Sequence, residues 1–413
     1  MDVSYPAAAE AFRAEVRTVL AEELPPGWAG IGAIADRAKA EQFAAQWRQT
    51  LYRRGLLGLI WPEEYGGRGL SPLHQVVLVE ELARAGVPYG GHTDLFGIKM
   101  LGSTLLRWGT AAQRRRFLPR ILSGADRWCQ GFSEPGAGSD LAALATRATL
   151  DGAEWVIDGQ KIWTSAAHRA NWIFLLARTG PPARGHRGIS FLLCPLEQPG
   201  IEIRPIRQLS GDSDFSEVFF TGARTAADMV VGEPGEGWPV AMTLLGHERG
   251  DEAATNPILF RAELDRLLAL AAERGADRDP LIRQRLAWCY GRVEIMRYLG
   301  YRILTQLQRP APDSGTGLGA AASIAKLYWS EYHVAATELA LDIEGLDGLV
   351  PAGRGPLRAV RTDDPGAPNS SGSWLGAFLN ARAGTIYAGT SEVQRNILAE
   401  TVLGLPKERR EHV

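Results

Sequence analysis

The sequence predicts a mixed α+β fold, with an all-helical N-terminal domain over residues 1–125, a middle antiparallel β domain (sandwich or barrel) over 126–235, and a C-terminal four-helix bundle over 236–413. In both outer segments apolar residues recur every three or four positions, the spacing of helices with one buried face. Between them the apolar runs are short, rich in β-branched and aromatic residues, and separated by Gly and Pro turns, as in strands. A chain of 413 residues is also too long for one ordinary core.

The N-terminal segment begins with Phe12, Val16 and Leu20 at four-residue steps, which predicts a first helix with one apolar stripe. The pair Pro25-Pro26 ends it. Further helices are expected over residues 38–55, 72–85, 96–108 and 111–122.

The middle segment changes to strand-like runs bounded by Asp-Gly, Pro-Pro and Gly-rich turns. The predicted strands cover residues 155–163, 171–177, 189–194 and 217–220.

The C-terminal segment contains a helix beginning near Pro280, whose apolar stripe runs through Leu286, Cys289, Val293 and Met296. Such a stripe fits one helix of a bundle, and it implies self-association. The other predicted helices cover 242–274, 321–343 and 374–403, and residues 351–373 are expected to form an exposed loop.

The composition of the chain argues against several classes of function. The chain is 45% hydrophobic and 22% charged, as in soluble globular proteins. A net charge of −2 provides no basic footprint for nucleic acid or an anionic membrane, and no apolar run reaches membrane-spanning length. The scattered Cys129, Cys194 and Cys289 indicate reduced thiols in a cytoplasmic protein, with neither a zinc site nor a disulfide framework.

The stretch Gly131-Phe-Ser-Glu-Pro-Gly-Ala-Gly-Ser-Asp140 is the most informative local pattern. It is predicted to be a short strand entry over Gly131–Ser133 that runs into a glycine-rich loop. Glycines let the backbone approach a ligand, and Ser133 and Ser139 add hydroxyl groups at the same place. Taken alone, such a loop is more often a polar surface hairpin whose glycines serve turn geometry.

This pattern resembles the first signature of the acyl-CoA dehydrogenase family. Three more stretches follow in the family's order: Pro62-Glu-Glu-Tyr-Gly-Gly67, Lys161-Ile-Trp-Thr-Ser165 and Ile386-Tyr-Ala-Gly-Thr-Ser-Glu-Val-Gln-Arg395. The resemblance implies bound FAD and oxidation of an acyl thioester, carried by CoA or a carrier protein, to its α,β-enoyl form. It also implies electron transfer to an electron-transfer flavoprotein and an oligomer that is usually tetrameric.

The resemblance further implies which residues bind the cofactor. Trp163 would flank the isoalloxazine and Ser165 would hydrogen-bond it near N5. Other contacts would come from Thr164, from Gln130, Ser133, Gly138 and Ser139 at the polar edge of the ring, and from Thr390 and Glu392 in the C-terminal helix. Without the resemblance, a Trp ending a strand is more often core packing, and Glu392 is equally a solvated helix charge.

Catalysis of this kind needs a base for the α-proton and donors aimed at the thioester carbonyl. In many family members the base is a Glu immediately before Gly-Thr-Ser, but here that residue is Ala388. The backbone N–H of Ala388 survives the change and keeps the carbonyl donor. Gly389 and Ser139 are the neighbouring substrate-binding candidates.

A second branch, resembling the isovaleryl- and long-chain acyl-CoA dehydrogenases, carries its base on the helix after the β domain, directly before an Arg. Here that place holds His247-Glu248-Arg249-Gly250. Glu248 is therefore the predicted base, and Arg249 would orient it or lie near the thioester. Asp251 and Glu252 are alternative carboxylates, and an ordinary helical ion-pair face is the competing interpretation.

Three other functions stay open at this point. The chain could be a non-catalytic subunit that pairs with an active homologue, since the usual base is missing. It could be an oxygen-using flavoenzyme on the same fold, such as an N-hydroxylase or nitroalkane oxidase. It could also be an acyl-thioester binding module without flavin chemistry. Whether the oligomer contains one kind of chain or two is likewise open.

Overall fold

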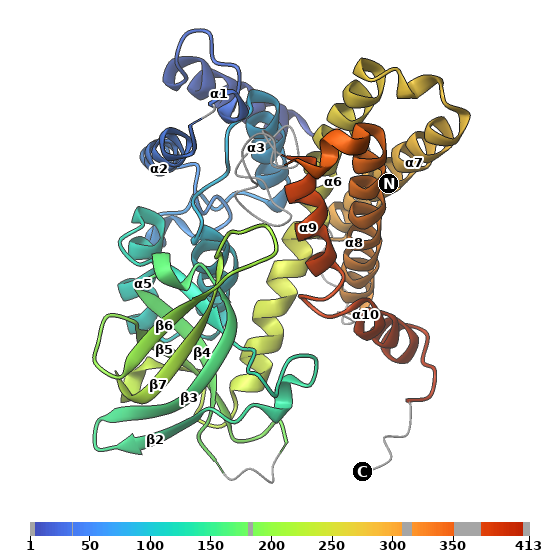
Figure 1. The fold of residues 1–413 in the computed structure, drawn as a ribbon. Helices are drawn as coiled ribbons and strands as arrows, with labels where there is room; N and C mark the ends of the chain where they lie inside the picture. Colours follow the sequence, from blue (N-terminus) through green and yellow to red (C-terminus); the bar gives the residue numbers. More distant parts are fainter. Residues whose placement is uncertain (1–4, 35, 181–184, 308–315, 351–372, 408–413) are drawn as a thin grey trace. The chain divides into compact units, whose positions relative to one another are not determined.

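The computed structural model describes residues 5–34, 36–180, 185–307, 316–350 and 373–407. The chain divides into two compact units (Figure 1). We call Ala45–Leu70 with Gly90–Glu248 the β unit, and Met1–Ala44, Ser71–Tyr89 and Arg249–Val413 the helical unit. Each is described on its own.

In the helical unit, α1 (Ala7–Glu23) packs against α3 (Pro72–Ala85). Phe12, Val16 and Leu20 are buried, which confirms the predicted stripe. Arg13 on α1 binds Glu81 on α3 at 2.7 Å, and both side chains are buried. Helix α2 spans Arg37–Arg53.

In the β unit, a π-helical segment η3 (Leu95–Gly102) continues directly into α4 (Ser103–Trp108), and α5 covers Ala111–Ser123. The two helices predicted at 96–108 and 111–122 are therefore present. Thr110 and Gln113 start α5 with reciprocal side-chain-to-backbone hydrogen bonds, a capping box.

Eight strands in the described residues form one sheet, in the order β6-β7-β3-β2-β4-β5-β8, with β1 beside β4. Their bounds are β1 Trp128–Gly131, β2 Arg147–Asp151, β3 Glu154–Ser165, β4 Trp172–Arg178, β5 Ile189–Pro195, β6 Ile201–Ile206, β7 Phe215–Ala226 and β8 Val230–Val231. The strands predicted at 155–163, 189–194 and 217–220 lie within β3, β5 and β7, and the strand predicted at 171–177 matches β4 except at its first residue. Side chains such as Ile157, Leu175 and Val218 fill the core of this sheet.

The sheet is antiparallel except beside β4, where β1 pairs in parallel over four residues and β2 at one. A parallel neighbour needs a long connection, and the chain between β1 and β4 provides one. The loop of the first motif belongs to that connection. Strand β1 ends at Gly131, so Phe132 and Ser133 already lie in the loop rather than in the predicted strand entry.

The C-terminal part of the chain is helical, as predicted. It comprises α6 (Gly237–Glu273), α7 (Pro280–Leu307), α8 (Thr316–Glu344), α9 (Trp374–Gly384), α10 (Ser391–Ile397) and the π-helical η10 (Leu398–Val402). Leu286, Cys289, Val293 and Met296 of α7 are buried in one core with residues of α6, α8 and α9. None of the helices in the described ranges has the length and apolar character needed to cross a membrane.

One predicted helix is wrong in extent. Residues 374–403 do not form a continuous helix, because α9 ends at Gly384 and α10 begins only at Ser391. Between them Ala388 and Gly389 have φ of 53° and 88°, left-handed values that interrupt a right-handed helix. Residues 351–372 of the expected loop lie outside the described residues.

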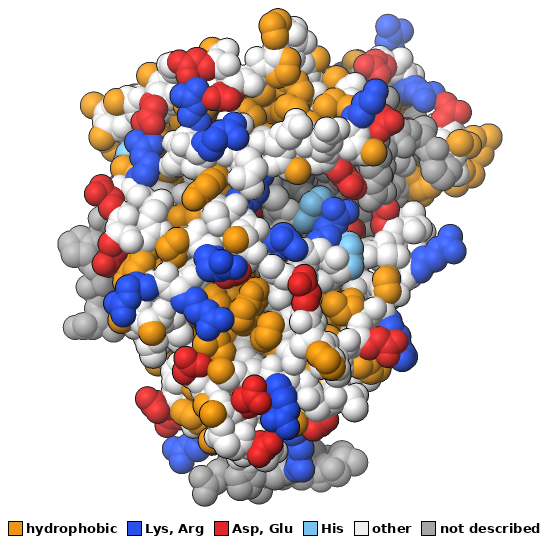
Figure 2. All heavy atoms as spheres, turned by 90° about the vertical axis from the view of Figure 1, so that its left-hand side faces the viewer, with side chains coloured by type: hydrophobic (Ala, Val, Ile, Leu, Met, Phe, Trp, Pro, Cys, Tyr) orange, Lys and Arg blue, Asp and Glu red, His pale blue; other side chains and the backbone are white. Residues whose placement is uncertain are grey.

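On the face drawn in Figure 2, Lys and Arg side chains are interspersed with Asp and Glu, in keeping with the net charge of −2.

Candidate functional site

The first and third motifs lie next to each other in the β unit. Glu134 and Ala137 exchange two backbone hydrogen bonds of 3.0 Å, which close the loop tightly around Pro135 and Gly136. The backbone N–H of Ile162 in β3 donates to the Ser133 carbonyl at 2.9 Å. The structure thus brings Ser133 beside the end of β3, where Trp163 and Ser165 follow.

A buried ion pair holds the two motifs together. The Lys161 ammonium donates to the Glu134 carboxylate at 2.7 Å and to the Phe132 carbonyl at 3.2 Å. Glu134 also accepts from the backbone N–H groups of Ala145 and Thr146 at 2.5 and 3.0 Å. Because its remaining acceptors are satisfied in this way, the carboxylate fixes three chain segments at once.

Both charges are affected by burial. Burial lowers the pKa of Lys161 to about 8, against the opposing attraction of Glu134. For Glu134 burial acts to raise the pKa, but the Lys161 charge and the hydrogen bonds from Lys161, Thr146 and Ala145 outweigh it and hold the pKa below its usual value. Each charge therefore favours the ionised form of the other.

Trp163 is presented to solvent by an irregularity in β3. The pairing register with β7 shifts between Lys161 and Thr164, as in a β-bulge, and Trp163 has a left-handed φ of 59°. The residue is 58% exposed, and its ring makes an edge contact with Phe215 at a centroid distance of 6.2 Å. Core packing is thus excluded for Trp163. Left-handed geometry costs a non-glycine residue roughly 1–2 kcal/mol, and such strain is concentrated at functional sites.

The other predicted cofactor residues of the β unit differ in accessibility. Gln130, Ser133 and Ser165 are partly exposed, and Gly138 and Ser139 are exposed. Thr164 is fully buried, and its hydroxyl has no hydrogen-bond partner among the described residues. Its neighbour across the strands, Ser216, is buried and unpaired in the same way. A contact from Thr164 to a cofactor would therefore use its backbone.

An exposed indole face with hydroxyl groups and a glycine loop beside it fits a flat, partly polar heteroaromatic ring. The isoalloxazine of FAD is such a ring. The residues of the β unit that would hold it are Trp163, Ser165, Ser133 and Ser139.

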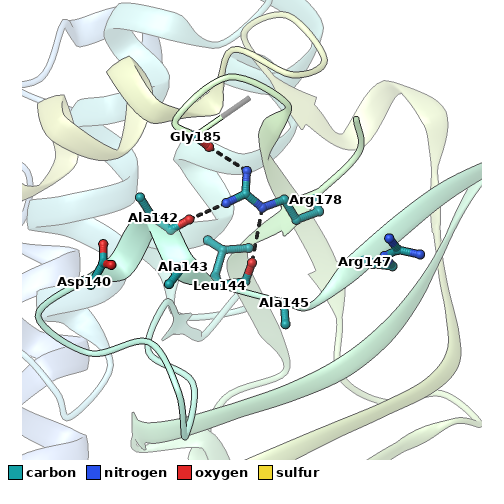
Figure 3. Close-up of a pocket in the computed structure, with 8 residues that line it drawn as sticks. All are labelled: Asp140, Ala142, Ala143, Leu144, Ala145, Arg147, Arg178 and Gly185. Carbon is teal, nitrogen blue, oxygen red and sulfur yellow. Dashed lines mark hydrogen bonds between the residues drawn. The ribbon is translucent and has the colours of Figure 1, made fainter. Parts of the chain in front are cut away.

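A cavity of about 510 Å³ lies directly after the first motif, lined by Asp140, Ala142, Ala143, Leu144, Ala145, Arg147, Arg178 and Gly185 (Figure 3). The Arg178 guanidinium donates to the carbonyl oxygens of Leu144 at 3.2 Å and Gly185 at 2.6 Å, and to that of Ala142. It therefore shapes the wall of the cavity. Arg147 is exposed and forms no ion pair within the described chain, so it is available to a polar ligand.

The predicted residues of the helical unit lie in the turn between α9 and α10. No acceptor among the described residues receives the backbone N–H groups of Ala388 or Gly389, and both residues are partly exposed. Two adjacent left-handed residues with unpaired N–H groups form a site for a carbonyl or an anionic oxygen. This geometry supports the donor role predicted for Ala388.

Thr390 and Glu392 sit at the start of α10. The Thr390 hydroxyl accepts from the Val393 N–H at 3.1 Å and caps the helix. The Glu392 backbone N–H and the Thr390 hydroxyl hold the pKa of the exposed Glu392 carboxyl below its usual range. Glu392 is thus a charged group at a helix N-terminus, and its contact with FAD stays a prediction.

The predicted base lies on α6, but the side chains of residues 247–254 are outside the described part of the chain. This range includes Glu248 and Arg249 as well as the alternatives Asp251 and Glu252. Their catalytic roles stay predictions.

Models of known protein families match this chain over most of its length. Three family models match in succession: the N-terminal domain of acyl-CoA dehydrogenases at residues 6–125, the middle domain at 129–223 and the C-terminal domain at 235–403. The fold is that of a flavin-dependent dehydrogenase. The chain belongs to the acyl-CoA dehydrogenase family, and it is an FAD-dependent oxidoreductase acting on CH–CH groups.

Individual relatives are similar over nearly their full length. Acyl-CoA dehydrogenase IpdE1 of Mycobacterium tuberculosis is 45% identical over 407 residues, covering 97% of this chain and 98% of the relative. The solved Tcur3481-Tcur3483 steroid ACAD is 33% identical, with a TM-score of 0.79 over 99% of this chain and 100% of that one. The ChsE4-ChsE5 complex from Mycobacterium tuberculosis is 29% identical, with a TM-score of 0.77 and the same coverage.

Glu134 and Lys161 belong to the first and third motifs, but the sequence alone did not indicate a role for either residue. The available signal was the alternation of the strand, which places Lys161 on the same face as the apolar Trp155 and Ile157. A charge at such a position requires a partner, and the glutamate of the other motif was the obvious candidate.

Proposed function

We propose that the protein oxidises a bulky acyl-CoA to the trans-2-enoyl-CoA, with Glu248 as the base. The observation that carries this proposal is the turn at Ala388, which has unpaired N–H groups but no carboxylate at the family's commonest base position. A base must then come from elsewhere, and Glu248-Arg249 on α6 matches the family's second arrangement.

In this proposal Glu248 removes the α-proton. The N–H groups of Ala388 and Gly389 donate to the thioester oxygen, where negative charge grows as that proton leaves. FAD, held by Trp163, Ser165, Ser133 and Ser139, would supply the hydride acceptor for the β-hydrogen. Trp163 provides a flat surface that orients the cofactor and excludes water from one side of it.

The CoA portion offers phosphates and amides to the protein. The cavity beside Asp140 has an unpaired cation in Arg147 and lies next to Ser139, a predicted substrate contact. We propose that a polar part of the CoA group enters this cavity. A carrier-protein thioester presents the same pantetheine chemistry without the nucleotide.

The acyl group is proposed to be bulky. An alanine at position 388 leaves the space that a glutamate side chain would fill, and two solved relatives at 33 and 34% identity are steroid ACADs. A polycyclic or branched acyl group fits both observations.

The protein is proposed to work with a different, homologous chain. On α7, Leu281, Trp288 and Ile295 recur at seven-residue steps and are 74, 40 and 47% exposed, an apolar stripe that needs a partner. The same helix carries five arginines and one glutamate.

Arg285 and Arg297 already pair with Asp342 and Glu294, and the remaining surplus of arginine on α7 would be complemented better by a partner helix with acidic residues than by a second copy. Two of the solved relatives are complexes of two chains. A heteromer is therefore favoured over the homotetramer. We keep the electron-transfer flavoprotein as electron acceptor.

A cytoplasmic location is part of the proposal as well. Cys129, Cys194 and Cys289 are all buried free thiols, and burial raises the pKa of each. Such cysteines are inert packing residues, as is usual in reducing compartments.

The test is anaerobic titration of the purified yellow protein with acyl-CoAs that range from short straight chains to ring-bearing ones. Bleaching of the flavin band by the bulky substrates is expected. Glu248→Gln should bind them with little change and reduce flavin at least ~10²–10⁴-fold more slowly. Glu233→Gln, an exposed carboxylate of the β unit, serves as the matched control.

Each rival predicts a different result. A colourless protein that refuses FAD supports the binding module, and rapid reoxidation by air supports the oxygen-using enzyme. Full activity of Glu248→Gln in a complex with a second chain supports a subunit whose partner supplies the base.

A further inference from the structure

We infer that Gln394 is a positioning residue that aims the Ala388–Gly389 turn at the thioester carbonyl. The inference rests on the proposed function. It gives Gln394, which the motifs did not single out, the role of holding this turn in place. All residues involved belong to the helical unit.

The Gln394 side chain is fully buried, with 0% of the residue exposed. Its Nε2 donates to the carbonyl oxygen of Ala388 at 2.9 Å. The Oε1 atom of the same amide has no partner among the described residues. Within the described residues, the hydrogen bond of this carboxamide therefore goes to the residue whose backbone is predicted to bind substrate.

This bond fixes the direction of a second donor. The chain has no cis peptide bonds in its described part, so the carbonyl of Ala388 and the N–H of Gly389 point in opposite directions across one planar unit. When Gln394 holds the carbonyl toward the buried side, the Gly389 N–H must point the other way. That N–H is one of the two unpaired donors of the turn.

The contact is also sterically specific. A Cβ added to Gly389 would lie 2.5 Å from Nε2 of Gln394, closer than such atoms approach. Gly389 therefore lets the amide reach the Ala388 carbonyl, and its φ of 88° suits glycine alone. Glycine and glutamine act together to keep Ala388 in its left-handed conformation.

Gln394 is not needed to start α10. The Thr390 hydroxyl already accepts from the Val393 N–H, and the Ser391 N–H donates to the Thr385 carbonyl at 3.0 Å. Helix capping is thus provided by other groups, which leaves orientation of the peptide unit as the role of the amide.

The test uses Gln394→Glu in the FAD-loaded protein. The variant keeps the shape but replaces the donor with an acceptor that repels the Ala388 carbonyl, so the peptide unit should turn and direct its carbonyl at the ligand. The matched control is Gln113→Glu. Gln113 is another buried glutamine whose Nε2 donates to two backbone carbonyls, those of Asp228 and Val230, in the β unit.

The readout is the absorption band of a bound aryl-acryloyl-CoA, which moves to longer wavelength when its thioester carbonyl is polarised. We expect the shift in the parent and in the control, and its loss in Gln394→Glu. Flavin reduction by a substrate should fall ~10²–10³-fold in its limiting rate, the usual cost of losing one such donor, with little change in half-saturation. Gly389→Ala should produce the same defect, and the two changes should not add.

An unchanged shift in Gln394→Glu, or additive effects of the two substitutions, overturns the inference while leaving the proposed function intact. Absence of the shift in the parent overturns both. If Gln394→Glu does not fold, Gln394→Met, which removes the donor without adding charge, provides the same comparison.

Discussion

Glu134 and Lys161 form an ion pair of 2.7 Å inside the β unit, with side-chain exposures of 7 and 0%. One residue comes from the glycine-rich loop and the other from the strand that ends in Trp163. The pair therefore links the loop that would approach a cofactor to the strand that would carry its aromatic platform.

Removing one member of this pair should be strongly destabilising. Lys161→Met leaves the Glu134 carboxylate buried without its counter-charge, so unfolding free energy should fall by about 3–5 kcal/mol in denaturant titrations. In Lys161→Met/Glu134→Gln part of this loss should return, because the uncharged amide oxygen still accepts from the N–H groups of Ala145 and Thr146. Arg224→Met breaks the exposed pair with Glu154 and should cost less than about 1 kcal/mol. Equal losses in both single variants would contradict a special role for the buried pair.

The pair should also make stability depend on acid. The folded-state pKa of Glu134 lies below the ordinary value of a glutamate carboxyl. Its stabilisation is thus fully present above that value and is lost as pH falls through the lowered folded pKa. Thermal unfolding of the parent and Glu134→Gln should differ most near neutral pH and converge in acid. A gap that widens on acidification would show the opposite sign.

Substitutions of Trp163 and Trp155 should have different effects, the first on FAD binding and the second on stability. Trp163→Ala removes an exposed ring, so unfolding free energy of the FAD-free protein should change by only about 0.5 kcal/mol while FAD is released more readily. Trp155 on the same strand is 6% exposed, and Trp155→Ala should cost about 3–5 kcal/mol. Both are measured by denaturation and by the flavin content after dialysis. Unaltered FAD retention in Trp163→Ala would remove the platform role.

A glutamate introduced at position 388 should act as a catalytic base. Ala388→Glu in a Glu248→Gln background places a carboxylate at the family's other base position and should restore part of the flavin reduction by a straight-chain acyl-CoA. Bulky substrates should benefit less, because the new side chain occupies their space. Stopped-flow reduction rates with both substrates check this. Equal recovery with both would argue against Ala388 as a determinant of acyl size.

The α7 stripe should be required for assembly with a second chain. Trp288→Glu puts a charge into the exposed stripe and should abolish the complex with a co-expressed homologous subunit, as measured by light scattering after gel filtration. Leu150 on β2 is 52% exposed, and Leu150→Glu should leave the complex intact. A stable homotetramer of the parent chain alone would contradict the heteromer.

Much of the architecture is determined locally, and the sequence alone was enough to predict it. The three-part order, the four longer strands and the α7 stripe follow from periodicities within short segments. The strands β1, β2, β6 and β8 were missed because they are short or alternate too little. Their formation depends on neighbours that are distant in sequence.

The site depended on tertiary structure for its decisive features. From sequence alone, a lysine in a strand is expected to be exposed to solvent. Lys161 can be buried because the fold places Glu134 beside it, and the energy of a buried charge depends on its partner. The exposure of Trp163 and the break at Ala388 depend on left-handed backbone, which local propensity disfavours for these residues and only surrounding contacts stabilise. The sequence motifs identified these positions, and three-dimensional packing determined their burial, exposure and backbone conformation.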